Sequence, residues 1–285
     1  MLAAFWAQPV FAAEQEEISD LLRLSGLSAQ VRQFPEMVKV GILQAAEAEA
    51  LLSDVERDQM LAGVDRAFAP EALESSIGNE VGRALSRGDI TSLMAWYQSS
   101  IGKQITASEE RASTPAAYAE MMRRASELAQ NVELMEFAER LDQLLGATDM
   151  TLEIQKTSAL AVYAALATKT APEEPMDLLD YATQLEAMTP ELRPQVKQLV
   201  HISSAFAYEG VDEASRSKYE QFLRTPAASR FNTAVMEAFV AGFSEAVSAW
   251  AAELPFLLES DSASVDWSRS PYRRFAATSP AVSSR

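Results

Sequence analysis

The chain of 285 residues contains no cysteine and a single histidine. The absence of cysteine excludes disulfides and thiolate metal sites, so the fold must be stabilised by packing. With one imidazole, metal sites built from several histidines are excluded too, and a Ser-His-Asp triad would have to use His201. No carboxylate lies three or four residues from His201 in the sequence. We therefore predict a structural role for this residue rather than that of a catalytic base.

Positive charge is also scarce. The chain has 24 basic against 41 acidic side chains, a net charge of −17. Such a charge repels a phosphate backbone, so nucleic acid is excluded as an expected partner. The charge is unevenly distributed, because residues 260–285 carry four arginines and two aspartates, which leaves −19 for the rest of the chain.

Alternating patterns of β-branched residues are rare, and there are only 10 glycines. Good helix formers (Ala, Leu, Glu, Gln, Met and Arg) dominate instead. The sequence predicts an all-α multi-helix bundle. Nucleotide-binding glycine loops and the G-x-S-x-G nucleophile motif are missing, and no cofactor is predicted. Carboxylates are plentiful but stand near expected helix ends and turns, where the helix dipole favours them.

Glycine and proline mark the expected helix boundaries. Gly26 predicts the end of a first helix that contains Ile18. Separate helices are expected at 176–187 and after Thr189-Pro190, and Pro255 is expected to end the last one. In the Arg-Gly-Asp tripeptide at 87–89, we expect a glycine stop followed by an aspartate N-cap.

The N-terminus is apolar from Leu2 to Phe11, and Ala12 and Ala13 precede an acidic segment. This pattern is typical of the end of a secretory signal peptide, although the basic n-region is missing. Either a longer signal peptide begins upstream, or this segment is an apolar arm. We expect export, to the periplasm or beyond, and no membrane span in the mature chain.

Two segments with a similar pattern lie 126 residues apart, at 93–106 (LMAWYQSSIGKQIT) and 219–232 (YEQFLRTPAASRFN). The alignment pairs Trp96 with Phe222, Tyr97 with Leu223, Ser99 with Thr225, Ser100 with Pro226 and Gly102 with Ala228. A hydroxyl residue can cap a new helix, and proline fits its first position. We expect each segment to be a bent or restarted helix.

A second, weaker similarity lies between residues 18–27 and 175–185, at an offset of 157. Together the two similarities suggest a duplicated fold. The expected organisation is an apolar arm or signal-peptide remnant at 1–13, two related helical halves at 14–147 and 148–259, and a disordered or loosely docked tail at 260–285.

The segment Trp96-Tyr97-Gln98-Ser99-Ser100-Ile101-Gly102 resembles the aromatic-Tyr-x-Ser-Pro-x-Gly motif of an uncharacterised family of exported bacterial helical proteins. Ser100 stands where the family has proline, and the second copy keeps Thr225-Pro226 but has Leu223 and Ala228 for Tyr and Gly. The resemblance covers about a tenth of the chain. It implies an exported helical protein and supplies no catalytic residues.

These observations favour a non-catalytic interaction or scaffolding module of the bacterial envelope with a protein partner. One alternative is a carrier that holds an apolar small molecule between the two halves, lined by some of the 11 methionines. Another is a hydrolase with two carboxylates across a cleft. In the last helix, the stripe Phe231, Val235, Phe239, Phe243 and Val247 indicates either a core face or the seam of a homodimer.

Overall fold

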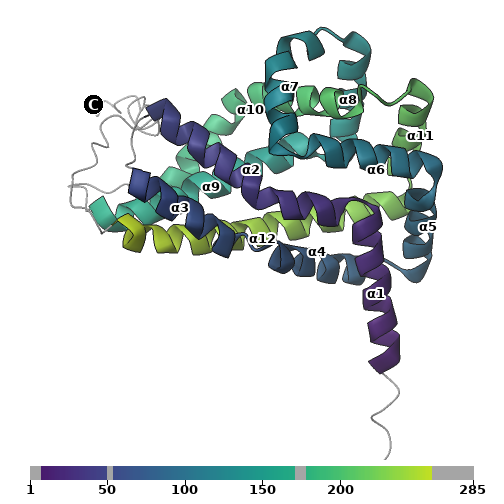
Figure 1. Cartoon of the computed structure of the whole chain (residues 1–285), viewed down its shortest axis with the longest axis horizontal. Helices are drawn as coiled ribbons and strands as arrows, with labels where there is room; N and C mark the ends of the chain where they lie inside the picture. Colours follow the sequence, from purple (N-terminus) through teal and green to yellow (C-terminus); the bar gives the residue numbers. More distant parts are fainter. Residues whose placement is uncertain (1–7, 50–53, 171–177, 259–285) are drawn as a thin grey trace, which may run out of the picture.

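The computed structural model describes residues 8–49, 54–170 and 178–258. These residues form twelve α-helices and no strand, which confirms the all-α multi-helix bundle (Figure 1). The helices are α1 (Gln8–Leu24), α2 (Leu27–Glu49), α3 (Asp54–Ala67), α4 (Pro70–Ala84), α5 (Arg87–Gln98), α6 (Ser100–Ala112), α7 (Pro115–Leu128), α8 (Val132–Leu145), α9 (Ala147–Thr170), α10 (Leu178–Tyr208), α11 (Glu213–Leu223) and α12 (Pro226–Leu258).

Helix α12 runs along the length of the bundle and packs against α3, α4 and α9 (Figure 1). Its predicted apolar stripe lies in the core: Phe231, Phe243 and Val247 are buried, and Val235 and Phe239 are partly buried against them. Around the middle of α12, Phe239 and Phe243 pack against Phe34 of α2. The stripe therefore joins α12 to the bundle, which is the core alternative of the sequence prediction.

The glycine stop of the first helix is confirmed. Gly26 has φ +79°, in the left-handed region that residues with a side chain disfavour, and α1 ends two residues earlier. A Cβ at this position would also lie 2.8 Å from the Thr106 side chain of α6. Conformation and space both require glycine here.

The predicted break at Thr189-Pro190 is wrong. Helix α10 continues from Leu178 to Tyr208 through Pro190 and Pro194, and the Thr189 hydroxyl donates to the Leu185 carbonyl instead of capping a new helix. The two prolines are four residues apart and both are exposed, so their rings share the solvent face of the helix. The other side packs against α8 and α9, and this tertiary contact outweighs the lost backbone hydrogen bonds. Helix α12 likewise extends to Leu258, so Pro255 does not end it.

The Arg-Gly-Asp tripeptide begins a helix in a different way from the prediction. Ser86 is the N-cap of α5, and Asp89 is its third residue, whose side chain accepts from the Ser86 backbone N–H in a capping box. Asp89 is buried and accepts from Arg230 of α12 at 2.5 Å. The Arg230 guanidinium and the Ser86 hydrogen bonds lower the pKa of Asp89 to about 2. The aspartate thus fastens α5 to α12.

Part of the expected domain organisation lies outside the described residues. This holds for the tail at 260–285 and for residues 1–7 of the N-terminal segment, while residues 8–13 belong to the first turns of α1. In the portions of the chain that are described, no helix combines the length and apolarity required to cross a bilayer.

Candidate functional site

The first motif copy forms a sharp corner between α5 and α6. Ser99 is extended (φ −65°, ψ 161°), and its N–H donates to the Trp96 carbonyl at 2.9 Å. Its hydroxyl accepts from the Gly102 N–H at 3.0 Å, which caps the new helix. The helix therefore restarts at Ser100, as the sequence predicts.

The second copy forms the same corner between α11 and α12. The Thr225 N–H donates to the Phe222 carbonyl at 2.9 Å, and the Thr225 hydroxyl accepts from the Ala228 N–H at 3.3 Å. Pro226 is the first residue of α12, where its missing N–H costs nothing. Each of these contacts joins positions aligned with those of the first corner, so both segments are restarted helices, as the sequence predicts.

The correspondence extends to the start of the helix before each corner. Ser86 caps α5 and is paired with Asp89, and Asp212 caps α11 and is paired with Ser215. These positions are again 126 residues apart, with the serine and the aspartate exchanged. The pattern S-x-x-D against D-x-x-S was the sequence signal for this equivalence.

The two corners lie against each other at one end of the bundle, from which α6 and α12 both run back (Figure 1). The aligned residues Trp96 and Phe222 stack with ring centroids 4.3 Å apart and planes 6° apart. Tyr97 packs edge-on against Phe222 at 5.7 Å. Residues that correspond in the alignment therefore touch in space.

At the third residue of the new helix, the second corner has a methyl group that the first corner lacks. A Cβ at Gly102 would lie 2.1 Å from the Trp96 carbonyl oxygen, a distance that no side chain tolerates. Ala228, at the aligned position, carries this methyl and is fully buried. Glycine is thus a requirement of the first corner only.

The second sequence similarity has no such counterpart. Residues 18–24 are the last turns of α1, whereas 178–185 are the first turns of α10. Leu22 is 3% exposed and its aligned residue Leu179 is 72% exposed. These two segments occupy dissimilar environments.

A buried carboxyl group lies behind the corners. Glu109 of α6 accepts hydrogen bonds from the hydroxyls of Tyr208 and Tyr219, the latter at 2.8 Å. The residue keeps some exposed surface, but its carboxyl group is enclosed by protein, and this burial raises its pKa although both hydroxyls act in the opposite direction. The contacts tie α6 to α10 and α11. No local sequence pattern predicts these contacts, since the tyrosine partners of Glu109 lie 99 and 110 residues away.

His201 has a carboxylate partner that sequence spacing did not reveal. Its Nε2 lies 3.3 Å from Oδ2 of Asp142 on α8. Asp142 also accepts from the Thr148 N–H at Oδ1 (2.8 Å) and from the Thr148 hydroxyl at Oδ2 (2.6 Å). Burial raises the pKa of Asp142, but the hydrogen bonds from Thr148 and His201 outweigh it and lower the pKa. The side chains of His201 and Asp142 are only 8% and 10% exposed. This enclosed cluster joins α8, α9 and α10.

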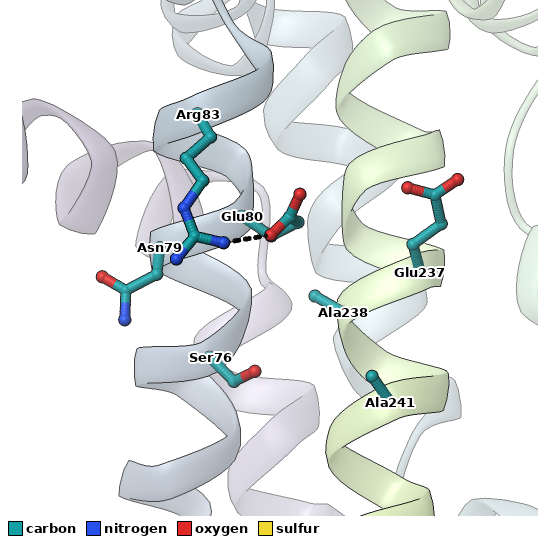
Figure 2. A pocket seen from close by; sticks show the side chains of 7 residues that line it. All are labelled: Ser76, Asn79, Glu80, Arg83, Glu237, Ala238 and Ala241. Atoms are coloured by element: carbon teal, nitrogen blue, oxygen red, sulfur yellow. Dashed lines mark hydrogen bonds and ion pairs between the residues drawn. The ribbon is translucent and has the colours of Figure 1, made fainter.

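A groove with a volume of about 330 Å³ lies between α4 and α12 (Figure 2). Its lining residues are Ser76, Asn79, Glu80, Arg83, Glu237, Ala238 and Ala241. Glu80 is paired with Arg83 at 2.7 Å on the α4 side. Across the groove, Glu237 of α12 has no hydrogen-bond or ion-pair partner among the described residues.

The character of the groove bears on the alternative hypotheses. Its charged lining does not fit the apolar pocket expected of a lipid-like carrier. Met121 and Met135 pack instead in a small core cluster with Leu128 and Ile202. No group of three or more metal-ligating side chains occurs within the described ranges.

Comparisons with family models, curated proteins and solved structures found no match to the chain.

Proposed function

We propose that this chain is a non-catalytic, exported helical protein made of two related halves, and that it acts as an interaction or scaffolding module of the bacterial envelope. The observation that carries the proposal is the contact between the two motif copies. Trp96 and Phe222 stack in the interior, and the capping hydroxyls of Ser99 and Thr225 bind their own backbone. The motif residues therefore stabilise the helical bundle, and we assign partner binding to the surface of the bundle.

The polar groups of the interior support this division. The Glu109 carboxyl binds two tyrosines, and His201 binds Asp142. Each of these groups connects helices that are distant in sequence. They fix the relative positions of α6, α8, α10 and α11, which is what a scaffold requires.

The groove between α4 and α12 is the proposed contact surface (Figure 2). Glu237 offers a carboxylate without a partner, and the chain as a whole is strongly acidic. These features favour a protein partner with basic side chains, because complementary charge steers association and selects partners.

Export and duplication are parts of the same proposal. The apolar N-terminal segment supports export, and the resemblance to exported helical proteins agrees with it. The repeated cap, helix, corner and restart at 86–102 and 212–228 supports an origin of the two halves by duplication.

The proposal is tested by native mass spectrometry of the protein isolated from its own cells, which reports the mature N-terminus and any bound partner together. We expect a processed chain and a stoichiometric protein partner. Glu237→Lys should remove the partner, whereas Glu136→Lys, the same change at an exposed position of α8, should retain it.

The other hypotheses make different predictions in these experiments. An apolar carrier would show a bound small molecule that survives both substitutions. A hydrolase that uses the groove carboxylates Glu80 and Glu237 would turn over an envelope substrate, and Glu237→Gln would abolish that turnover with the fold retained. Either result would replace the proposed function.

A further inference from the structure

We propose that the groove between α4 and α12 is a docking site for the C-terminal segment of this same chain, and that Arg273 and Arg274 bind at its carboxylates. The partner of the proposed function would use the same groove, so the segment and the partner would compete for it, and the test below uses the isolated protein without a partner. Residues 259–285 lie outside the described part of the structure. The inference therefore rests on the groove, the length of the chain and the charge of both segments.

The groove presents the chemistry that a guanidinium group requires. Glu80 of α4 and Glu237 of α12 both belong to its lining, and the Ser76 hydroxyl lies on the α4 side (Figure 2). A planar guanidinium binds carboxylates through paired N–H donors, so arginine fits this arrangement better than lysine does. The Glu80–Arg83 ion pair is exposed, with Arg83 at 73%, so an incoming arginine can exchange with it.

The walls of the groove leave space for a second chain. Ala238 and Ala241 of α12 point toward α4 along this stretch, and both are small (Figure 2). Gly242 follows Ala241 directly, and a Cβ there would lie 2.9 Å from the Leu73 side chain of α4. Small residues hold the two helices close at one end and leave an open depression at the other.

The C-terminal segment is the part of the sequence with opposite charge. Residues 260–285 carry a net charge of +2 against −19 for the rest of the chain. The sequence Tyr272-Arg273-Arg274-Phe275 places two arginines between two aromatic residues. An aromatic ring can lie over the exposed Ala241 while the arginines reach the carboxylates.

The segment is long enough to reach the groove. Helix α12 ends at Leu258, 17 residues after Ala241, and spans about 26 Å between them. The 15 residues from Leu258 to Arg273 extend to about 50 Å, so the chain can fold back along α12 with slack.

The chain has no cysteine, which permits a direct test in the full-length protein. One cysteine replaces Ser76 in the groove and another replaces Ser270, and a short bismaleimide is added to dilute protein. We expect a fast intramolecular crosslink. The matched control places the first cysteine at Ser248, an exposed residue of α12 nearer to the C-terminal segment. A segment without a docking site would meet Ser248 more often than Ser76.

Charge reversal completes the test. The double substitution Arg273→Glu and Arg274→Glu should slow the Ser76 crosslink about fivefold. This is the effect expected when ion pairs as weak as exposed surface pairs are lost. Adding Glu237→Arg should restore the rate, and 1 M salt should slow the unsubstituted pair. Thermal unfolding of each variant checks that the body stays folded.

Three results would overturn the inference. The first is a Ser76 crosslink no faster than that of Ser248. The second is a Ser76 rate that charge reversal leaves unchanged. The third is a crosslinked dimer on denaturing gels in place of the intramolecular product, which would assign the groove to the segment of a second copy.

Discussion

The corners at Ser99 and Thr225 show how two different sequences form the same capping hydrogen bonds. Both use a hydroxyl cap and a backbone hydrogen bond back to an aromatic residue. The first corner relies on Gly102, because the Trp96 carbonyl occupies the space of a Cβ. The second relies on Pro226, whose fixed φ begins the new helix, and it accommodates the methyl group of Ala228. The capping hydrogen bonds are thus shared, whereas only the second corner has room for a Cβ at the third residue of the new helix.

The contact between the corners gives the largest expected effect. Phe222→Ala removes a ring that packs against Trp96, Tyr97 and Tyr219, and should lower the free energy of unfolding by about 4 kcal/mol. Trp96→Ala should cost a similar amount, measured by urea denaturation. The double variant should lose about 1 kcal/mol less than the sum, because the stacking is lost only once. Additive costs would show that the two rings stabilise the fold independently.

The exchange of glycine and alanine tests the difference between the corners. Gly102→Ala should lower the free energy of unfolding by about 3 kcal/mol, because the new Cβ meets backbone that cannot move away. Ala228→Gly should cost only about 1 kcal/mol, the usual helix penalty of glycine. If urea denaturation gave equal costs for the two substitutions, the two corners would have the same room for a Cβ at this position.

A buried carboxyl group beyond the first corner should make stability depend on pH. Val235 occupies the position aligned with Glu109, so the helix after the second corner has no such group there. Since burial raises the folded-state pKa of Glu109, its contribution is fully present below the unfolded pKa of about 4.3 and is lost as pH rises through the folded pKa.

Glu109→Gln keeps an acceptor for both tyrosines and removes the titration. The wild-type protein should lose stability relative to this variant above about pH 4.3, by at most about 1.4 kcal/mol per pH unit. Urea denaturation at several pH values measures the difference, and Glu136→Gln on the surface serves as the control. Parallel stability curves for Glu109→Gln and the wild type would contradict a raised pKa.

The two capping hydroxyls should give the smallest effect. Ser99→Ala and Thr225→Ala each remove one acceptor for a helix N-terminus, and each should cost about 1 kcal/mol in thermal or urea unfolding. Similar values would extend the equivalence of the corners from geometry to energetics. If only Thr225→Ala lowered stability, the Ser99 hydroxyl would not contribute to capping α6.

The sequence by itself determined what depends on residues within one turn of each other. Helix-forming composition specified the all-α class, and Gly26, Ser99 and Thr225-Pro226 specified the breaks, because a cap or stop forms its hydrogen bonds three or four residues away. Only the tertiary structure decided that the corners face each other, that Glu109 meets two tyrosines and that His201 meets Asp142. It also carried α10 through Pro190 and Pro194. These outcomes depend on which helix faces pack together, and the contacts they create join residues 59 to 126 positions apart, beyond the reach of any local pattern.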